Sequence, residues 1–230
     1  MEQQFFDRRK QTDIAIQHNQ FGLALKIPAQ LFSYFFHPLF IPLIATWYMA
    51  FLQPGYFTGI PAGNKVYILI RVAYNTIFFP ALTVLLLRAL GFIQSIFLKT
   101  QRERIIPYVA ANIFYFWMYL VFKNQPEVPL ILTMFIFGIF LSSSFGLFVN
   151  NYFKISMHAL GMGSFTGLIL IIIFSGLSYS IFLPAMIIFL LTGIVCTSRL
   201  IVSDHLPFQI YTGILFGIIS QLLAYAFIGI

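Results

Sequence analysis

The last fifty residues contain two apolar runs, IFLPAMIIFLLTGIVCT (181–197) and FQIYTGILFGIISQLLAYAFIGI (208–230), separated by SRLIVSDHLP (198–207). Runs of this kind are long enough for a helix to cross about 30 Å of hydrocarbon, which takes roughly 20 residues. In lipid we expect helices, because open strands would leave backbone groups without hydrogen bonds. The short segment between the runs therefore places Arg199 and His205 together at a membrane surface.

Composition extends this interpretation to the whole chain. Hydrophobic residues make up 60% of the sequence and charged residues only 8%, and the mean hydropathy is +0.91. These values lie far outside the range of water-soluble domains. Further apolar runs occur at 32–52, 67–90, 106–122, 128–149 and 159–177. We expect an all-α, polytopic integral membrane bundle of six to seven transmembrane helices, in a plasma or inner membrane.

The domain organisation is expected to be simple. Residues 1–30 form a polar tail or an interfacial helix, and residues 31–230 form one transmembrane domain. The formal net charge of +7 is spread over several loops and helix ends, which argues against nucleic acid and favours membrane lipids or a phosphorylated lipid as partners. The single cysteine excludes a disulfide framework, and no residue set suggests a metal or another cofactor. The oligomeric state is left open.

Three polar segments follow the second, fourth and sixth apolar runs. They are Lys99–Pro107, Lys154–His158 and Ser198–His205. An even number of crossings separates them, so they emerge on the same face of the membrane. Charged side chains near a bilayer are costly in free energy unless they are paired, hydrated or have a function. The clustering of cations in these three segments therefore favours an anion site. The alternative is that these are ordinary loop cations that anchor helices at the headgroups.

The same segments resemble the three motifs of the type 2 phosphatidic acid phosphatase family, which includes the vanadium-dependent haloperoxidases. Ser198-Arg199-x5-His205 is similar to the third motif, and Ser156 and His158 keep their places in the second. Lys99 and Pro107 keep the spacing of the first. The resemblance covers about residues 95–215 and implies a membrane-bound phosphatase fold with metal-independent hydrolysis of a lipid phosphate monoester or diphosphate.

The resemblance also implies roles for the site residues. His205 would be the nucleophile that forms a phosphohistidine, and His158 the general acid that protonates the leaving oxygen. Gln209 stands where the family has the aspartate that orients the nucleophile; its amide oxygen can accept a hydrogen bond but carries no charge. A phosphoryl group in transfer needs several fixed donors. The candidate donors are Lys99, Arg102, Arg104, Lys154, Ser156 and Arg199.

Several positions depart from the family pattern. Ile106 replaces the arginine of the first motif, so that Arg104 would have to fill its place, and the second motif lacks its proline and glycine. A catalytically inactive relative that binds lipid headgroups as a scaffold or partner subunit is therefore the alternative function. A transporter fits less well, because its polar elements would lie near the bilayer midplane. His37, before Pro38, is interpreted as interfacial.

Sidedness and substrate stay open at this stage. Arg8, Arg9 and Lys10 are expected on the same side as the three polar segments, which argues for the cytoplasmic face. The family resemblance implies the outer face instead. Phosphatidic acid, phosphatidylglycerol phosphate, an isoprenyl diphosphate and a lipid A phosphate all fit the pattern.

Overall fold

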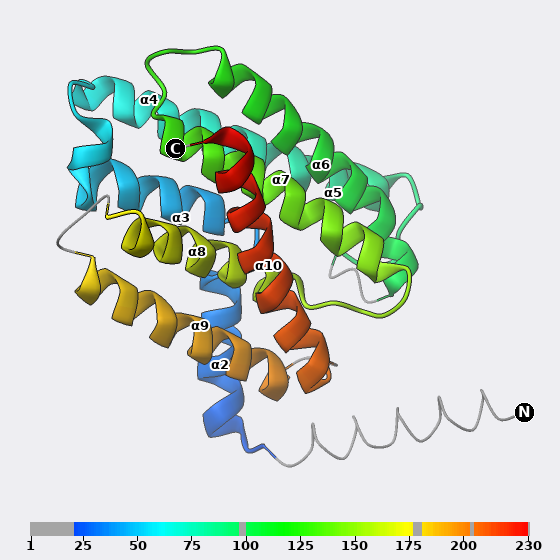
Figure 1. Cartoon of the computed structure of the whole chain (residues 1–230). Helices are drawn as coiled ribbons and strands as arrows, with labels where there is room; N and C mark the ends of the chain where they lie inside the picture. The colour runs from blue at the N-terminus through cyan, green and yellow to red at the C-terminus, as the bar shows by residue number, and fades with distance from the viewer. Residues whose placement is uncertain (1–20, 97–99, 177–180, 203–204, 230) are drawn as a thin grey trace, which may run out of the picture.

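The protein is predominantly helical in the part that the structure describes. The computed structural model describes residues 21–96, 100–176, 181–202 and 205–229, and none of them lies in a strand. The helices are α2 (Leu23–Phe35), α3 (Ile41–Trp47), η1 (Tyr48–Leu52), η2 (Pro54–Phe57), α4 (Ala62–Ala73), η3 (Tyr74–Phe78), α5 (Phe79–Ala89), α6 (Gln101–Lys123), α7 (Leu130–Asn150), α8 (Met157–Phe174), α9 (Phe182–Val202) and α10 (Pro207–Ile228) (Figure 1).

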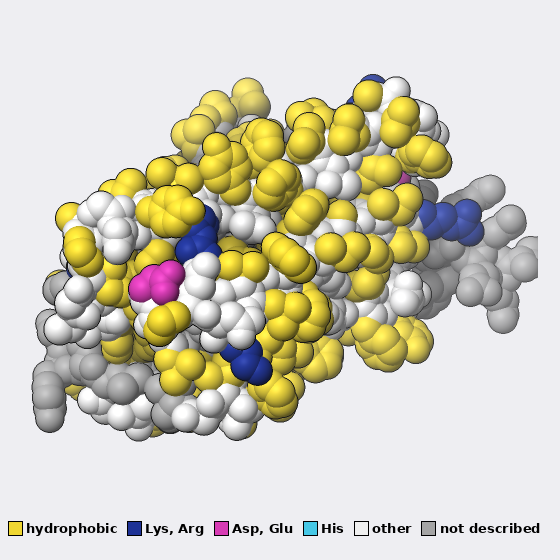
Figure 2. All heavy atoms as spheres, turned by 90° about the horizontal axis from the view of Figure 1, so that it is seen from above, with side chains coloured by type: hydrophobic (Ala, Val, Ile, Leu, Met, Phe, Trp, Pro, Cys, Tyr) yellow, Lys and Arg dark blue, Asp and Glu magenta, His cyan; other side chains and the backbone are white. Residues whose placement is uncertain are grey.

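Six helices in this part of the chain are long and apolar enough to cross a membrane. They are the continuous helix 62–89, formed by α4, η3 and α5, and the helices α6, α7, α8, α9 and α10. Figure 2 shows one face of the molecule, where hydrophobic side chains cover most of the surface and the charged side chains are few and scattered. The prediction of an all-α, multi-pass membrane bundle is thus confirmed.

The apolar run 32–52 does not form one membrane-spanning helix, because it is interrupted at Pro38. α2 ends at Phe35, a turn follows in which the Phe40 N–H donates to the His37 carbonyl (2.8 Å), and α3 begins at Ile41. Pro38 explains the break, because proline disfavours helical backbone at the residue before it. The remaining apolar helix, Ile41–Leu52, has only 12 residues, and at 1.5 Å per residue it reaches roughly 18 Å. It is too short to cross the hydrocarbon alone.

The centre of the bundle is α8, which lies between α3 and α9 and packs closely against α10 (Figure 1). Glycines make this approach possible. A Cβ atom at Gly217 of α10 would overlap the Leu160 carbonyl oxygen and lie 2.6 Å from the Ser164 backbone nitrogen on α8. Small residues of this kind allow helix backbones to approach closely in membranes. The starts of α8 and α10 are therefore held side by side, and both carry candidate site residues.

α2 runs across the bundle instead of alongside it. It packs against α9, and Figure 1 shows the two helices crossing. Ala29 and Ser33 are buried on its inner side, whereas Leu31, Tyr34 and Phe35 are exposed. Because it ends beside the start of α8, α2 brings residues 33–38 to the candidate site.

Candidate functional site

The three polar segments of the sequence come together in the structure. Three positive charges act electrostatically on the His205 imidazole: Arg104 from α6, Lys154 from the connection between α7 and α8, and Arg199 from the last turn of α9. These residues come from all three segments, as the crossing count predicts. Lys99, a further predicted ligand, lies outside the described residues.

His205 is held by Gln209. The Nδ1 atom of His205 lies 3.0 Å from the Oε1 atom of Gln209, and the Leu206 N–H donates to the same oxygen at 3.2 Å. Both side chains are buried, with 6% and 4% of their surface exposed. An amide oxygen only accepts hydrogen bonds, so Nδ1 carries the proton and Nε2 carries the lone pair. The ring therefore presents a nucleophilic nitrogen on the side away from Gln209.

The charge state of His205 follows from its surroundings. Burial lowers the pKa of His205 to about 3; the hydrogen bond to Gln209 opposes this shift, and the charges of Arg104, Lys154 and Arg199 add to it. The imidazole is therefore neutral at physiological pH. A neutral imidazole is the form that can attack phosphorus.

Arg104 and Arg102 occupy different faces of α6. Arg104 is only 7% exposed, and its Nη1 donates to the Ile155 carbonyl at 3.1 Å, which fixes the guanidinium beside the segment leading into α8. Arg102 is exposed. Ile106, which stands at the position of the family arginine, is 46% exposed. Arg104 thus takes the site position.

Ser156 lies at the N-cap of α8. Its Oγ accepts from the Ala159 N–H at 3.4 Å, and its own N–H donates to the Gln209 carbonyl at 3.3 Å. The serine is fully buried. Its clearest role is to cap α8 and to connect the starts of α8 and α10, which sets the spacing between His158 and His205. The N-terminus of α8 also directs the favourable end of the helix dipole toward this region.

His158 lies in the first turn of α8 and faces α2. Its Nε2 is 3.0 Å from the Ser33 carbonyl oxygen, and its ring stands edge-on to His37, with 5.4 Å between the ring centroids. His37 is the site residue that sequence reasoning missed, because a histidine before a proline at the start of an apolar run is typical of an interfacial position. The positive charge of Arg199 acts electrostatically on His37, His158 and His205.

Among the described acidic residues, Glu103 lies near the site in sequence, but its carboxylate bonds elsewhere. The Glu103 carboxylate accepts from the backbone N–H groups of Gln94 (2.8 Å) and Thr100 (3.2 Å), where it completes the capping box of α6. Asp204 lies outside the described residues. No group of three His, Cys, Asp or Glu side chains that could hold a metal ion occurs in the described ranges. Gln209 is therefore the orienting group that the structure assigns to His205.

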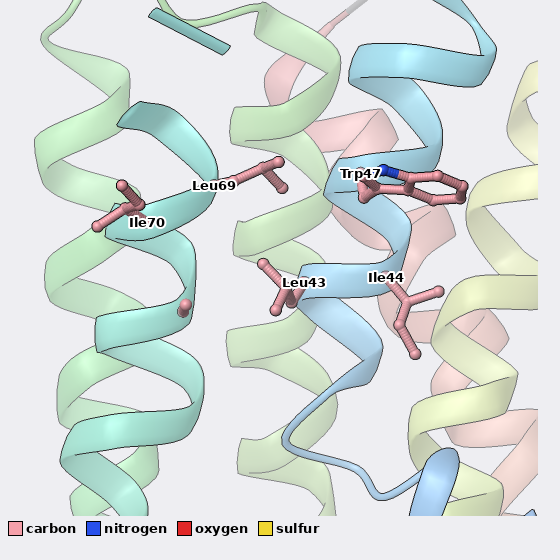
Figure 3. Close-up of a pocket in the computed structure, with 6 residues that line it drawn as sticks. Leu43, Ile44, Trp47, Leu69 and Ile70 are labelled. Carbon is pink, nitrogen blue, oxygen red and sulfur yellow. The ribbon is translucent and has the colours of Figure 1, made fainter. Parts of the chain in front are cut away.

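A separate groove on the surface has a different character. It lies between α3 and α4, has a volume of about 430 Å³, and is lined by Leu43, Ile44, Trp47, Leu69, Ile70 and Ala73 (Figure 3). All of these side chains are apolar. The groove has no charged side chain that could bind a phosphate.

Comparison with known proteins adds no relative to this picture. Searches of protein-family models, curated proteins and solved structures found no match to the chain. The candidate site therefore consists of His37, His158 and His205, the cations Arg104, Lys154 and Arg199, and the positioning residues Ser156 and Gln209.

Proposed function

We propose that this protein is a membrane lipid phosphatase that hydrolyses a lipid phosphate monoester or diphosphate through a phosphohistidine at His205. The observation that carries the proposal is the neutral, buried His205 ring, which is bonded through Nδ1 to Gln209 and lies within the electrostatic influence of three cationic side chains. Cations hold the phosphate oxygens, and the Nε2 lone pair supplies the nucleophile. The motif resemblance to type 2 phosphatidic acid phosphatases supports the same assignment.

The reaction would proceed in two steps. Nε2 of His205 attacks phosphorus, the bond from phosphorus to the lipid oxygen breaks, and His158 gives its proton to that oxygen. A bound phosphate carries negative charge, which favours the protonated form of His158 before this step. Neutral His158 then takes a proton from water, the hydroxide attacks phosphorus, and the P–N bond breaks. Inorganic phosphate and neutral His205 are regenerated.

The atom that His158 uses follows from its contact with α2. The Ser33 carbonyl can only accept, so Nε2 of neutral His158 carries hydrogen. Proton transfer to the lipid oxygen therefore takes place through Nδ1. We infer a lipid substrate because the site lies at the ends of long apolar helices.

The alternative is a catalytically inactive protein that binds anionic headgroups as a scaffold or partner subunit. One observation favours it: Gln209 brings no negative charge to stabilise the positive imidazole ring that forms when His205 attacks. In serine proteases, a related loss of the carboxylate that orients the catalytic histidine lowers turnover by about 10⁴-fold. The cationic site would bind a phosphate equally well in this case.

Phosphate release separates the two functions. Detergent-purified protein is incubated with phosphatidic acid, phosphatidylglycerol phosphate, an isoprenyl diphosphate and a lipid A phosphate, and inorganic phosphate is measured. Release by the wild type that His205→Ala abolishes is the expected result. Binding of these lipids by a folded wild type with no phosphate release would support the scaffold instead.

A further inference from the structure

We propose that His37 and the end of α2 belong to the catalytic site, as the positioning group that holds His158 in one tautomer with Nδ1 available to the lipid oxygen. His37 is more than 120 positions away from His158 in sequence, yet their ring centroids are 5.4 Å apart at an interplanar angle of 82°. The catalytic part of this inference rests on the proposed phosphatase function; the tautomer does not.

The backbone of α2 sets the first constraint on His158. The Ser33 carbonyl lies in the last turn of α2, and its oxygen is 3.0 Å from Nε2 of His158. A carbonyl has no proton to donate, so this contact selects the tautomer with hydrogen on Nε2. The second ring nitrogen, Nδ1, then carries the lone pair and is the position that can gain and lose the catalytic proton.

His37 sets the second constraint, because a hydrogen bond alone allows the ring to pivot about it. The His37 ring meets the His158 ring edge to face and limits its rotation. His37 is itself fixed in the turn between α2 and α3, where its Nδ1 accepts from the Leu39 N–H at 3.4 Å. The turn exists because Pro38 interrupts the helix, so the local sequence that ends α2 also places this ring.

The surroundings of His37 agree with a role inside the site. Burial and, to a smaller extent, the positive charge of Arg199 together lower the pKa of His37 to about 4. The ring is therefore neutral at physiological pH and adds no repulsive charge beside His158. Arg199, one of the cations assigned to the phosphate, acts electrostatically on both rings.

Nitrogen NMR tests the tautomer without requiring turnover. The chain has four histidines, so ¹⁵N-histidine labelling in detergent gives a spectrum that His→Asn substitutions can assign. We expect wild-type His158 to show hydrogen on Nε2 only. His37→Ala should give an average of both tautomers, whereas His37→Phe, which keeps an aromatic edge, should retain the wild-type signal. Tyr34→Ala is the matched control, because Tyr34 lies in the last turn of α2, close to His37 in sequence, and is 60% exposed.

Three results would overturn the inference. They are hydrogen on Nδ1 or mixed tautomers in wild-type His158, an unchanged His158 signal in folded His37→Ala, and loss of the single tautomer in His37→Phe. If His37→Ala does not fold, the spectra of the wild type and of His37→Phe still show whether His158 is held in one tautomer. Failure of the proposed function is distinct: it appears as absence of phosphate release by the wild type, whatever the spectrum shows.

Leaving-group dependence tests the consequence for catalysis. A misplaced general acid slows departure of a lipid alcohol more than departure of an activated aryl oxygen, which needs no proton. We expect His37→Ala to lower kcat for a lipid phosphate about tenfold more than for an aryl phosphate, a part of the roughly 10²–10⁴-fold that a general acid contributes. His37→Phe should restore the wild-type ratio. Equal losses for both substrates would show that His37 acts only through general stability.

Discussion

The Nδ1 atom of His205 and the Oε1 atom of Gln209 lie 3.0 Å apart, so that a neutral amide orients the proposed nucleophile. Gln209→Asp would add a negative charge that stabilises the phosphorylated imidazolium. We expect turnover to rise tenfold or more, since a factor of ten needs only about 1.4 kcal/mol of transition-state stabilisation. Gln209→Leu should lower turnover, because it removes the hydrogen bond. Unchanged turnover in a folded Gln209→Asp protein would mean that another residue orients His205.

Acid should destabilise the folded protein through its buried histidines. The pKa values of His37 and His205 are lowered to about 4 and about 3, whereas an unfolded histidine titrates near 6.5. Between the folded and unfolded pKa values, the unfolded chain binds more protons than the folded protein does. The contribution of these histidines to the free energy of unfolding is therefore complete above about pH 7 and is lost as the pH falls. Melting temperature in detergent should decrease from pH 7 to pH 5. His205→Gln should show a weaker decrease; an identical pH dependence would place His205 in solvent.

Arg104 and Arg102 form a matched pair on one helix. Arg104→Met leaves the Ile155 carbonyl without its donor, which costs roughly 1–3 kcal/mol of stability, and removes one cation from the site. We expect inorganic phosphate and vanadate to inhibit this variant at least about tenfold more weakly, a loss equivalent to roughly 1.4 kcal/mol. Arg102→Met, on the exposed face, should change both quantities little. Equal effects of the two substitutions would contradict the assignment of Arg104.

Close packing of α8 against α10 can be tested at a glycine. Gly217→Ala forces a methyl group against the backbone of α8, and we expect a loss of about 1–3 kcal/mol. Gly193→Ala on α9 is the control, because nothing lies within 4 Å of a Cβ atom there. Thermal unfolding in detergent measures both. If Gly217→Ala melted at the same temperature as Gly193→Ala, α8 and α10 would have to be farther apart than the structure shows.

Part of the site could be predicted from the sequence because membrane spans impose alternating sides. Apolar runs located the helices, and the crossing count brought Arg104, Lys154 and Arg199 to one end. The sequence also contains a signal that distinguishes Arg104, on the site face of the helix, from Arg102. Thr100 and Glu103 form a capping box, which starts the helix at Gln101 and puts the two arginines on opposite faces, roughly 200° apart. The apolar run alone predicts that this helix starts at residue 106, which would place both arginines in the preceding loop.

His37 could not be found in this way. Its position depends on α2 crossing α9, a contact between segments far apart in the chain, and no local pattern encodes it. Pro38 and Pro42 predict an interruption early in the apolar run 32–52, and the structure has one there. Local sequence therefore predicts where a helix ends, whereas tertiary packing decides which residues that end touches.

In the proposed reaction, His205 carries the phosphoryl group during turnover. Lipid substrate labelled with ³²P is mixed with purified protein, the reaction is stopped with alkali, in which phosphohistidine survives, and the labelled peptide is identified by mass spectrometry. We expect label on the peptide that contains His205 in the wild type and none in His205→Ala. Phosphate release by the wild type with no label, or with label in His205→Ala, would contradict this reaction.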